Sequence, residues 1–250
     1  MHDSRSRWDV AAPSYLHSSW HGNEAALEHM LEVAKPDGGV LLDIATGAGH
    51  AALTFAPHVD SVAALDSSTG MLAVARAEAL RRGIDNIEFV EGDALRLPFS
   101  GESLDGILCR VAAHHFADPE GFLAECFRVL VAEGYLLLID TIGIEHQEAD
   151  DELHRLESLR DPSHVRNYTT PLWMRMARKA GFAVEYEESY PKPLNAKEWM
   201  DRMSVEGTTR AKIVDIIESP EGWLREYLLP HGEGDLLTFR LMESTMLLRK

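Results

Sequence analysis

The chain has 250 residues, 45% of them hydrophobic, and a formal net charge of -17. This size suits one domain that buries a sizeable core and carries a modest cap. A surface this acidic repels phosphate backbones and anionic headgroups, which argues against nucleic acid and membrane surfaces as partners. No apolar run approaches the ~20 residues that a membrane helix needs, so we expect no membrane insertion.

The two cysteines, Cys109 and Cys126, have neither a disulfide framework nor a metal-ligand spacing. Their scarcity favours a reducing compartment. The first residues lack the apolar stretch of a signal peptide, so we expect a cytoplasmic protein. The acidic side chains between residues 145 and 152 are interpreted as a solvated face, and no metal site is predicted. The sequence predicts no particular oligomeric state.

Apolar strand-like runs alternate with helix-like segments through the first two thirds of the chain. Runs that are apolar on both faces, and that helices separate, indicate a parallel sheet covered on both sides. Strands are predicted at 40–44, 61–66, from 87 onward, at 104–110 and at 134–141, with helices at 49–56, 70–82 and 119–131.

The pattern changes after residue 145. An acidic segment at 146–159 with leucines along one face is predicted to be a surface helix or a lid element. A further helix is predicted at 172–180, a second begins at the capping box of Asn195 and Glu198, and a third begins at Ser219-Pro220. Strands are predicted at 182–190 and 238–248. The segment 191–233 is interpreted as an insertion between the last two strands.

The stretch LLDIATGAGHAAL (41–53) combines a strand, an acid and a glycine-rich turn that opens a helix. Glycines let a ligand approach the backbone, and the free N–H groups of the new helix favour a carboxylate or phosphate. In an open parallel sheet such a site lies at the carboxyl ends of the strands. Asp66 ends the next strand, where its carboxylate can accept both hydroxyls of a ribose.

Two ligand classes share this turn and Asp66. A dinucleotide fingerprint requires G-x-G-x-x-G, and Ala52 is a tolerated third position. Asp43, however, would oppose a pyrophosphate, and it suits a ligand with a cationic amino-acid end. Asp93 follows the third strand, where adenine N6 could be bound.

The ordered segments DIATGAGH, LD, GDALRLPF, SLDGILCRVAAHHF and RVLVAEGYLLLIDT resemble the class I S-adenosylmethionine (SAM) dependent methyltransferases. The resemblance is to small-molecule enzymes similar to the ubiquinone/menaquinone biosynthesis C-methyltransferases, and it covers roughly residues 8–184. Ala45 and Leu104 depart mildly from the family, which usually has glycine and phenylalanine there. RDPSHVR (160–166) and EWMDRM (198–203) look like segments of one bacterial subgroup of this family.

The expected fold is α/β and Rossmann-like, with helices on both faces of a mostly parallel seven-stranded sheet whose last strand is antiparallel. A single domain would span residues 1–250. Its core is expected at about 36–145 and 170–250, and a small helical cap at 1–35, 145–168 and 191–233.

The resemblance implies methyl transfer from SAM to a small-molecule acceptor by direct in-line displacement, which leaves S-adenosylhomocysteine (SAH). Met71 can equally be interpreted as simple core. The resemblance implies that the cofactor contacts come from Tyr15, Asp43, Ala45, Thr46, Gly47, Gly49, Asp66, Ser67, Met71, Gly92, Asp93, Ala94, Cys109 and Arg110.

His114 and His115 follow the fourth strand at the carboxyl edge of the sheet. We predict that one of them, His115 before His114, faces the acceptor and removes its proton. The alternative is that they satisfy a buried hydrogen bond, and His164 is the next candidate. The segment 8–21, which includes Tyr15, is predicted to be a mobile lid over the cofactor.

Two other classes of protein are alternatives. A nicotinamide-dependent oxidoreductase shares the first turn and Asp66 and would not bind SAM. A SAM-binding protein without catalytic turnover would bind SAM and never consume it.

Overall fold

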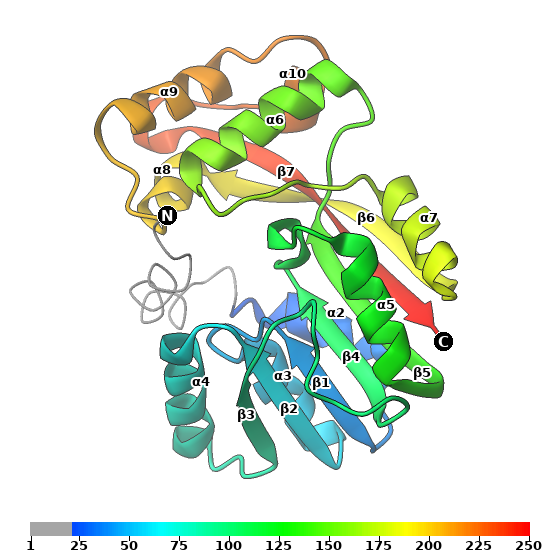
Figure 1. Cartoon of the computed structure of the whole chain (residues 1–250). Coiled ribbons are helices and arrows are strands. Elements are labelled where there is room, and N and C mark those ends of the chain that lie inside the picture. Colours follow the sequence, from blue (N-terminus) through cyan, green and yellow to red (C-terminus); the bar gives the residue numbers. More distant parts are fainter. Residues whose placement is uncertain (1–21) are drawn as a thin grey trace.

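The computed structural model describes residues 22–250, and the predicted lid at 8–21 lies outside them. The described chain forms a seven-stranded sheet in the order β3-β2-β1-β4-β5-β7-β6 (Figure 1). The strands are β1 (Val40–Ile44), β2 (Ser61–Asp66), β3 (Ile87–Glu91), β4 (Leu104–Arg110), β5 (Leu130–Thr141), β6 (Ala183–Asn195) and β7 (Thr238–Arg249).

Neighbouring strands from β3 across to β5 are parallel, with Leu42 of β1 opposite Ile107 of β4. Strand β7 runs antiparallel to both β5 and β6. The predicted mostly parallel sheet with an antiparallel last strand is therefore confirmed. The helices are α2 (Glu24–Ala34), α3 (His50–Phe55), α4 (Thr69–Arg82), α5 (Pro119–Val129), α6 (Gln147–Arg160), α7 (Thr170–Ala180), α8 (Ala196–Asp201), α9 (Gly207–Glu218) and α10 (Gly222–Leu228).

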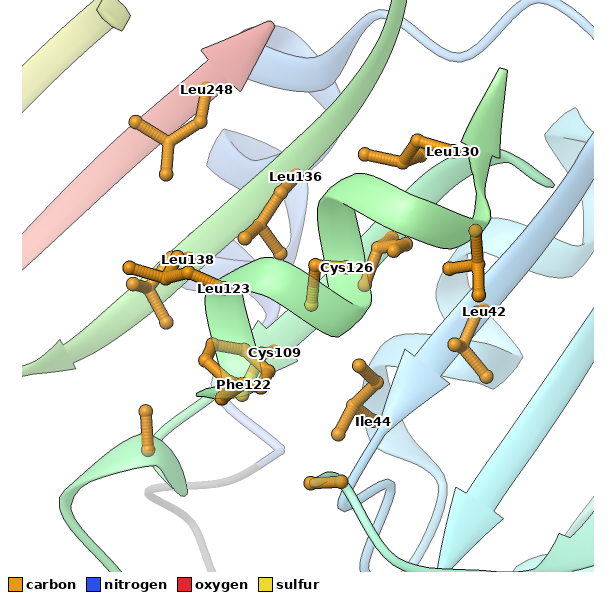
Figure 2. Packing of buried hydrophobic residues seen from close by; sticks show 14 of the residues in the cluster. Leu42, Ile44, Cys109, Phe122, Leu123, Cys126, Leu130, Leu136, Leu138 and Leu248 are labelled. Carbon is orange, nitrogen blue, oxygen red and sulfur yellow. The ribbon is translucent and has the colours of Figure 1, made fainter. Parts of the chain in front are cut away.

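Helix α5 shows how the sequence covers one face of the sheet. Its first turn has Pro119 and is capped by Asp118, whose Oδ1 accepts the Gly121 N–H at 2.8 Å. Its buried residues repeat at helical spacing and point at the sheet (Figure 2). Phe122, Leu123 and Cys126 thereby share one core cluster with Leu42, Leu136 and Leu138 of the strands.

The opposite face of the sheet is covered by α2 and α3. Leu27, Met30 and Ala34 of α2 share a second core cluster with Leu41 of β1 and Phe55 of α3. The sequence predicts that residues 1–35 belong to the cap, but among the described residues α2 packs against the sheet. The apolar residues of α2 form one stripe, and that stripe is buried against the sheet.

Strand β6 is longer than predicted. It continues through Pro191 and Pro193 to Asn195, pairing with β7 over this whole length. Proline donates no ladder hydrogen bond, but β6 is the edge strand and pairs on one side only, so the prolines are tolerated. The insertion between the last two strands therefore begins after Asn195 and not at residue 191.

A helical cap lies at one end of β6 and β7, where Figure 1 shows α6, α8, α9 and α10 together. The capping box predicted at its start is present in part, since Asn195 Oδ1 accepts the Glu198 N–H at 3.0 Å. The cap has its own core cluster, which includes Leu153, Leu156, Trp199, Ile213, Leu228 and the strand residues Leu194 and Leu241. Among residues 22–250, no helix combines the length and the apolar composition needed to cross a membrane.

Candidate active site

The turn after β1 carries three residues with positive φ. They are Ala45 (54°), Gly47 (55°) and Gly49 (85°). A Cβ added to Gly47 would meet nothing within 4 Å, whereas one on Gly49 would lie 2.9 Å from the Cβ of Ala75 in α4. Gly49 is thus required by the close approach of α4. The left-handed φ of Ala45 gives a physical reason for the glycine usual at that position.

The carboxylate of Asp43 closes this turn. Its Oδ2 accepts hydrogen bonds from Thr46 Oγ1 at 2.6 Å and from the Ala52 N–H at 3.1 Å. The second bond caps α3, whose N-cap residue, Gly49, has no side chain to do so. Burial raises the pKa of Asp43 to about 6, although both hydrogen bonds lower it. Asp43 therefore has a structural role that the sequence did not predict.

Asp66 at the end of β2 uses both of its carboxylate oxygens. Oδ2 accepts the Gly47 N–H at 2.9 Å and Oδ1 accepts the Ser68 N–H at 2.8 Å. Each carboxylate oxygen has two lone pairs, so each can accept more than one hydrogen bond. Asp66 thereby connects the glycine turn to the start of α4, where Ser68 Oγ accepts the Met71 N–H.

A cavity of about 220 Å³ extends from this turn to the cap. Eight of the predicted cofactor residues line it. They are Asp43, Ala45, Thr46, Gly47, Asp66, Ser67, Met71 and Arg110.

The other predicted cofactor residues that the structure describes do not line the cavity. Gly49 and Cys109 are buried, and Ala94 belongs to the core cluster below α5. Asp93 is exposed, and its Oδ1 accepts the Leu95 N–H at 2.9 Å. Gly92 packs so closely on Leu65 that an added Cβ would lie 2.7 Å from it. Tyr15 lies outside the described residues.

His114 lines the cavity and is held by Asp140, the penultimate residue of β5. Its Nδ1 lies 2.5 Å from Asp140 Oδ1, and its backbone N–H donates to Oδ2 at 2.7 Å. Burial alone would lower the pKa of His114, but the charge and hydrogen bond of Asp140 outweigh burial and raise it. Between β4 and this pair, Val111 adopts φ 53°, an uncommon conformation for a β-branched residue.

His115 also lines the cavity, in a different environment. Its Nδ1 lies 3.1 Å from the Ser163 carbonyl oxygen, and its Nε2 lies 3.9 Å from Asp161 Oδ2. Burial and the neighbouring His114 lower its pKa to about 4. His164 is buried outside the cavity lining, and burial is the main cause that lowers its pKa to about 2.

The sequence missed the residues that line the cavity on the cap side. Lys192 comes from β6, where it is buried and its Nζ donates to Glu243 Oε2 at 3.0 Å. Most of the others belong to α6, α8 or their ends, within or beside the segments 160–166 and 198–203. The full set, which we call the cap-side wall, is Glu157, Arg160, Asp161, Lys192, Trp199, Arg202 and Leu241.

The cavity thus combines two chemical environments. One end offers the carboxylate of Asp66 and an open glycine backbone at Gly47. The other end offers an imidazole whose Nδ1–H is held by a buried carboxylate, which leaves Nε2 able to accept a proton. The sheet order, the antiparallel last strand and this turn define a class I methyltransferase.

Comparisons with known proteins agree with this class. Residues 42–138 match a family model described as a methyltransferase domain. A solved structure of a candidate methyltransferase from Bacillus halodurans is 34% identical and has a TM-score of 0.86, covering 90% of this chain and 99% of that one. The chain therefore belongs to the methyltransferase domain family.

Two further relatives are similar over shorter stretches. The Bacillus subtilis protein YcgJ, described as an uncharacterized methyltransferase, is 38% identical over 162 residues, which are 65% of this chain and 64% of YcgJ. The demethylmenaquinone methyltransferase of Thermus thermophilus is 40% identical over 103 residues, 40% of this chain and 46% of that enzyme. The matched stretches thus span less than two thirds of YcgJ and less than half of the Thermus enzyme.

Proposed function

We propose that this chain transfers a methyl group from SAM to a small-molecule acceptor. The observation that carries the proposal is one cavity that Asp66, Gly47 and His114 all line. The carboxylate of Asp66 has lone pairs to accept ribose hydroxyls, and a ligand can approach the Gly47 backbone because no side chain covers it. A relative that is a demethylmenaquinone methyltransferase supports an acceptor of small-molecule type.

The described residues fit SAM as follows. Asp66 would bind the ribose, with Ser67 and Met71 beside ribose and adenine. The methionyl part would lie against the turn and Arg110. SAM supplies a methyl group on a sulfonium, ready for direct displacement. The remaining contacts are proposed from Asp43, Ala45, Thr46 and Gly47, which line the same cavity.

His114 is the better candidate for removing a proton from the acceptor, ahead of His115. The pKa of His114 is raised, so its neutral form is the stronger base. The pKa of His115 is about 4, so it is neutral at pH 7 and weakly basic. Asp140 would act as a positioning residue, because it keeps the proton on Nδ1 of His114 and directs Nε2 to the acceptor.

We also propose that the protein acts in the cytoplasm and has no nucleic-acid partner. The free thiols of Cys109 and Cys126 and the acidic net charge support this setting.

Calorimetric titration tests the proposal. SAM and SAH are expected to bind with similar affinity, and NAD and NADH are expected not to bind. Binding of NADH without SAH would instead support an oxidoreductase. Conversion of SAM to SAH in the presence of an acceptor, followed by mass spectrometry, separates an enzyme from a SAM-binding protein without turnover.

A further inference from the structure

Two sequence segments that the proposed reaction does not use meet at the cap-side wall. RDPSHVR begins with Arg160, the last residue of α6, and EWMDRM contains Trp199 of α8. Arg160 Nε donates to the Trp199 carbonyl oxygen at 3.0 Å. The Arg160 guanidinium carbon also lies 4.8 Å from the centroid of the Trp199 ring. The two segments therefore build one unit, and both residues line the cavity.

This contact fixes the direction of the Arg160 guanidinium. Stacking on an aromatic ring and a bond through Nε leave the two terminal amino groups, Nη1 and Nη2, as a preorganised fork. Within residues 22–250, neither amino group makes a hydrogen bond or salt bridge to protein. Such a fork matches the two oxygens of a carboxylate.

The acids nearest to Arg160 in sequence do not occupy this fork. Asp161 Oδ1 accepts the Ser163 N–H at 2.9 Å and the Ser163 hydroxyl at 2.7 Å. Glu157 is buried, and burial raises its pKa in spite of the nearby Arg160. Burial disfavours the ionised form of a carboxyl group in that environment.

Lys192, a second cation of the wall, is arranged differently. Lys192 is neutralised by Glu243, which also accepts a hydrogen bond from the Tyr190 hydroxyl at 3.0 Å. Apolar surface lies beside the cations, because Phe116, Trp199 and Leu241 line the same cavity. The wall thus presents the preorganised guanidinium of Arg160 next to apolar side chains.

We propose that the methyl acceptor is a small organic carboxylate, with its carboxylate bound by Arg160 and its apolar body against Trp199 and Leu241. This inference rests on the proposed methyltransferase function and names the chemical class of its acceptor.

The test is a set of matched acid and amide probes, titrated into protein saturated with SAH and followed by ligand-observed NMR. The acids are benzoate, phenylacetate and hexanoate, and each is compared with its own amide. In the wild type, at least one acid is expected to bind about tenfold or more tighter than its amide, as for a hydrogen bond to a charged group. Arg160→Gln is expected to remove that preference.

Arg155→Gln is the matched control on the same helix. Arg155 is exposed and pairs with Glu152 at 3.1 Å, outside the cavity lining, so its variant should keep the wild-type preference. Arg160→Lys keeps the charge but loses the fork, and it should show a reduced preference. SAH affinity and circular dichroism establish that each variant is folded, and Arg160→Lys serves as the test if Arg160→Gln does not fold.

Three outcomes would overturn the assignment. They are acids that bind no better than amides in the wild type, a preference that survives in Arg160→Gln, and a failure of all three acids to bind up to about 20 mM, roughly the weakest range useful for fragments of this size. Absence of SAH binding in the wild type would instead overturn the proposed function itself. SAH binding without any preference for acids would overturn only the carboxylate acceptor.

Discussion

Nδ1 of His114 lies 2.5 Å from Oδ1 of Asp140, and the backbone N–H of the same histidine donates to the other oxygen of that carboxylate. A carboxylate only accepts hydrogen bonds, so the ring proton is on Nδ1 and the free lone pair is on Nε2. Both residues are almost fully buried, with side-chain exposures of 12% and 1%. The pair therefore sets both the orientation and the basicity of the imidazole.

Asp140→Asn is expected to lower the pKa of His114. Burial opposes the charged imidazole, and the negative charge of Asp140 is what raises the pKa above its usual value of 6.5. Without that charge, burial dominates. Titration of the imidazole resonances by NMR measures the change. Glu157 makes a weaker contribution that also raises the pKa of His114. Glu157→Gln should therefore lower this pKa less than Asp140→Asn does, and an equal or larger decrease would contradict the assignment.

His114→Ala is expected to slow methyl transfer by about 10²–10⁴-fold, the usual contribution of a general base. The wild-type rate should fall as pH drops below the raised pKa of His114, because the protonated ring cannot accept a proton. That fall should vanish in the variant. His115→Ala should have a smaller effect and keep the pH dependence. Comparable rates of both variants and the wild type would exclude either histidine as the base.

Asp66→Ala is expected to weaken SAH binding by about 1.5–3 kcal/mol, because two hydroxyl donors lose a charged acceptor. The measurement is calorimetric titration at neutral pH. Asp85→Ala is the control, since Asp85 is exposed and precedes β3 at the opposite edge of the sheet. Unchanged affinity in Asp66→Ala would remove Asp66 from the cofactor site.

Asp43→Asn is expected to stabilise the fold at pH 8 and to have little effect near pH 4. The raised folded-state pKa means that the native state binds the Asp43 proton more tightly than the unfolded state, so stability falls as pH rises from about 3.8 to about 6. The penalty above that range is up to about 3 kcal/mol. The amide oxygen of the introduced asparagine can still accept from Thr46 and Ala52, which both contact one oxygen of Asp43.

Urea denaturation of the wild type and Asp43→Asn at the two pH values measures this difference. A variant that is less stable than the wild type at both values would show that the charge of Asp43 is needed by the turn itself.

Gly49→Ala and Gly83→Ala separate backbone strain from steric overlap. Both glycines have positive φ, 85° and 69°, which costs an L-residue about 1–2 kcal/mol. A Cβ on Gly83 meets nothing within 4 Å, whereas one on Gly49 overlaps Ala75. Gly49→Ala should therefore lose about 1–3 kcal/mol more in the free energy of unfolding than Gly83→Ala. Equal losses would mean that α4 moves freely away from the turn.

The parallel half of the sheet was predictable because its signals are local. Strands β1, β2 and β4 are apolar on both faces, and Gly83 and Gly181 end two of the helices at the expected places. The extension of β6 past Tyr190 was not predictable, because prolines normally indicate the end of a strand. Only the sheet order shows that β6 is an edge strand. At an edge, the missing N–H groups of Pro191 and Pro193 deprive no neighbouring strand of a hydrogen-bond donor.

The same distinction applies to the site. The glycine turn with Asp43 and Gly47 is one contiguous stretch, and Asp66 ends the next strand, so the three residues could be identified in order. The cap-side wall is assembled mainly from α6, β6 and α8. Arg160 and Lys192 are distant in sequence, and they line the same cavity only because of tertiary folding. The partner of His114 was missed for the same reason, since Asp140 lies 26 residues further along the chain.

Strands β6 and β7 stay paired from Ala183 and Arg249 to Asn195 and Thr238, so they leave the sheet as one two-stranded arm. Helices α8, α9 and α10 form an insertion between the end of β6 and the start of β7, as Figure 1 shows. Replacing this insertion would change Trp199 and Arg202 without shifting the register of any strand. The architecture therefore lets the part of the cap-side wall within residues 196–237 change, while Arg160 and the turn after β1 stay in place.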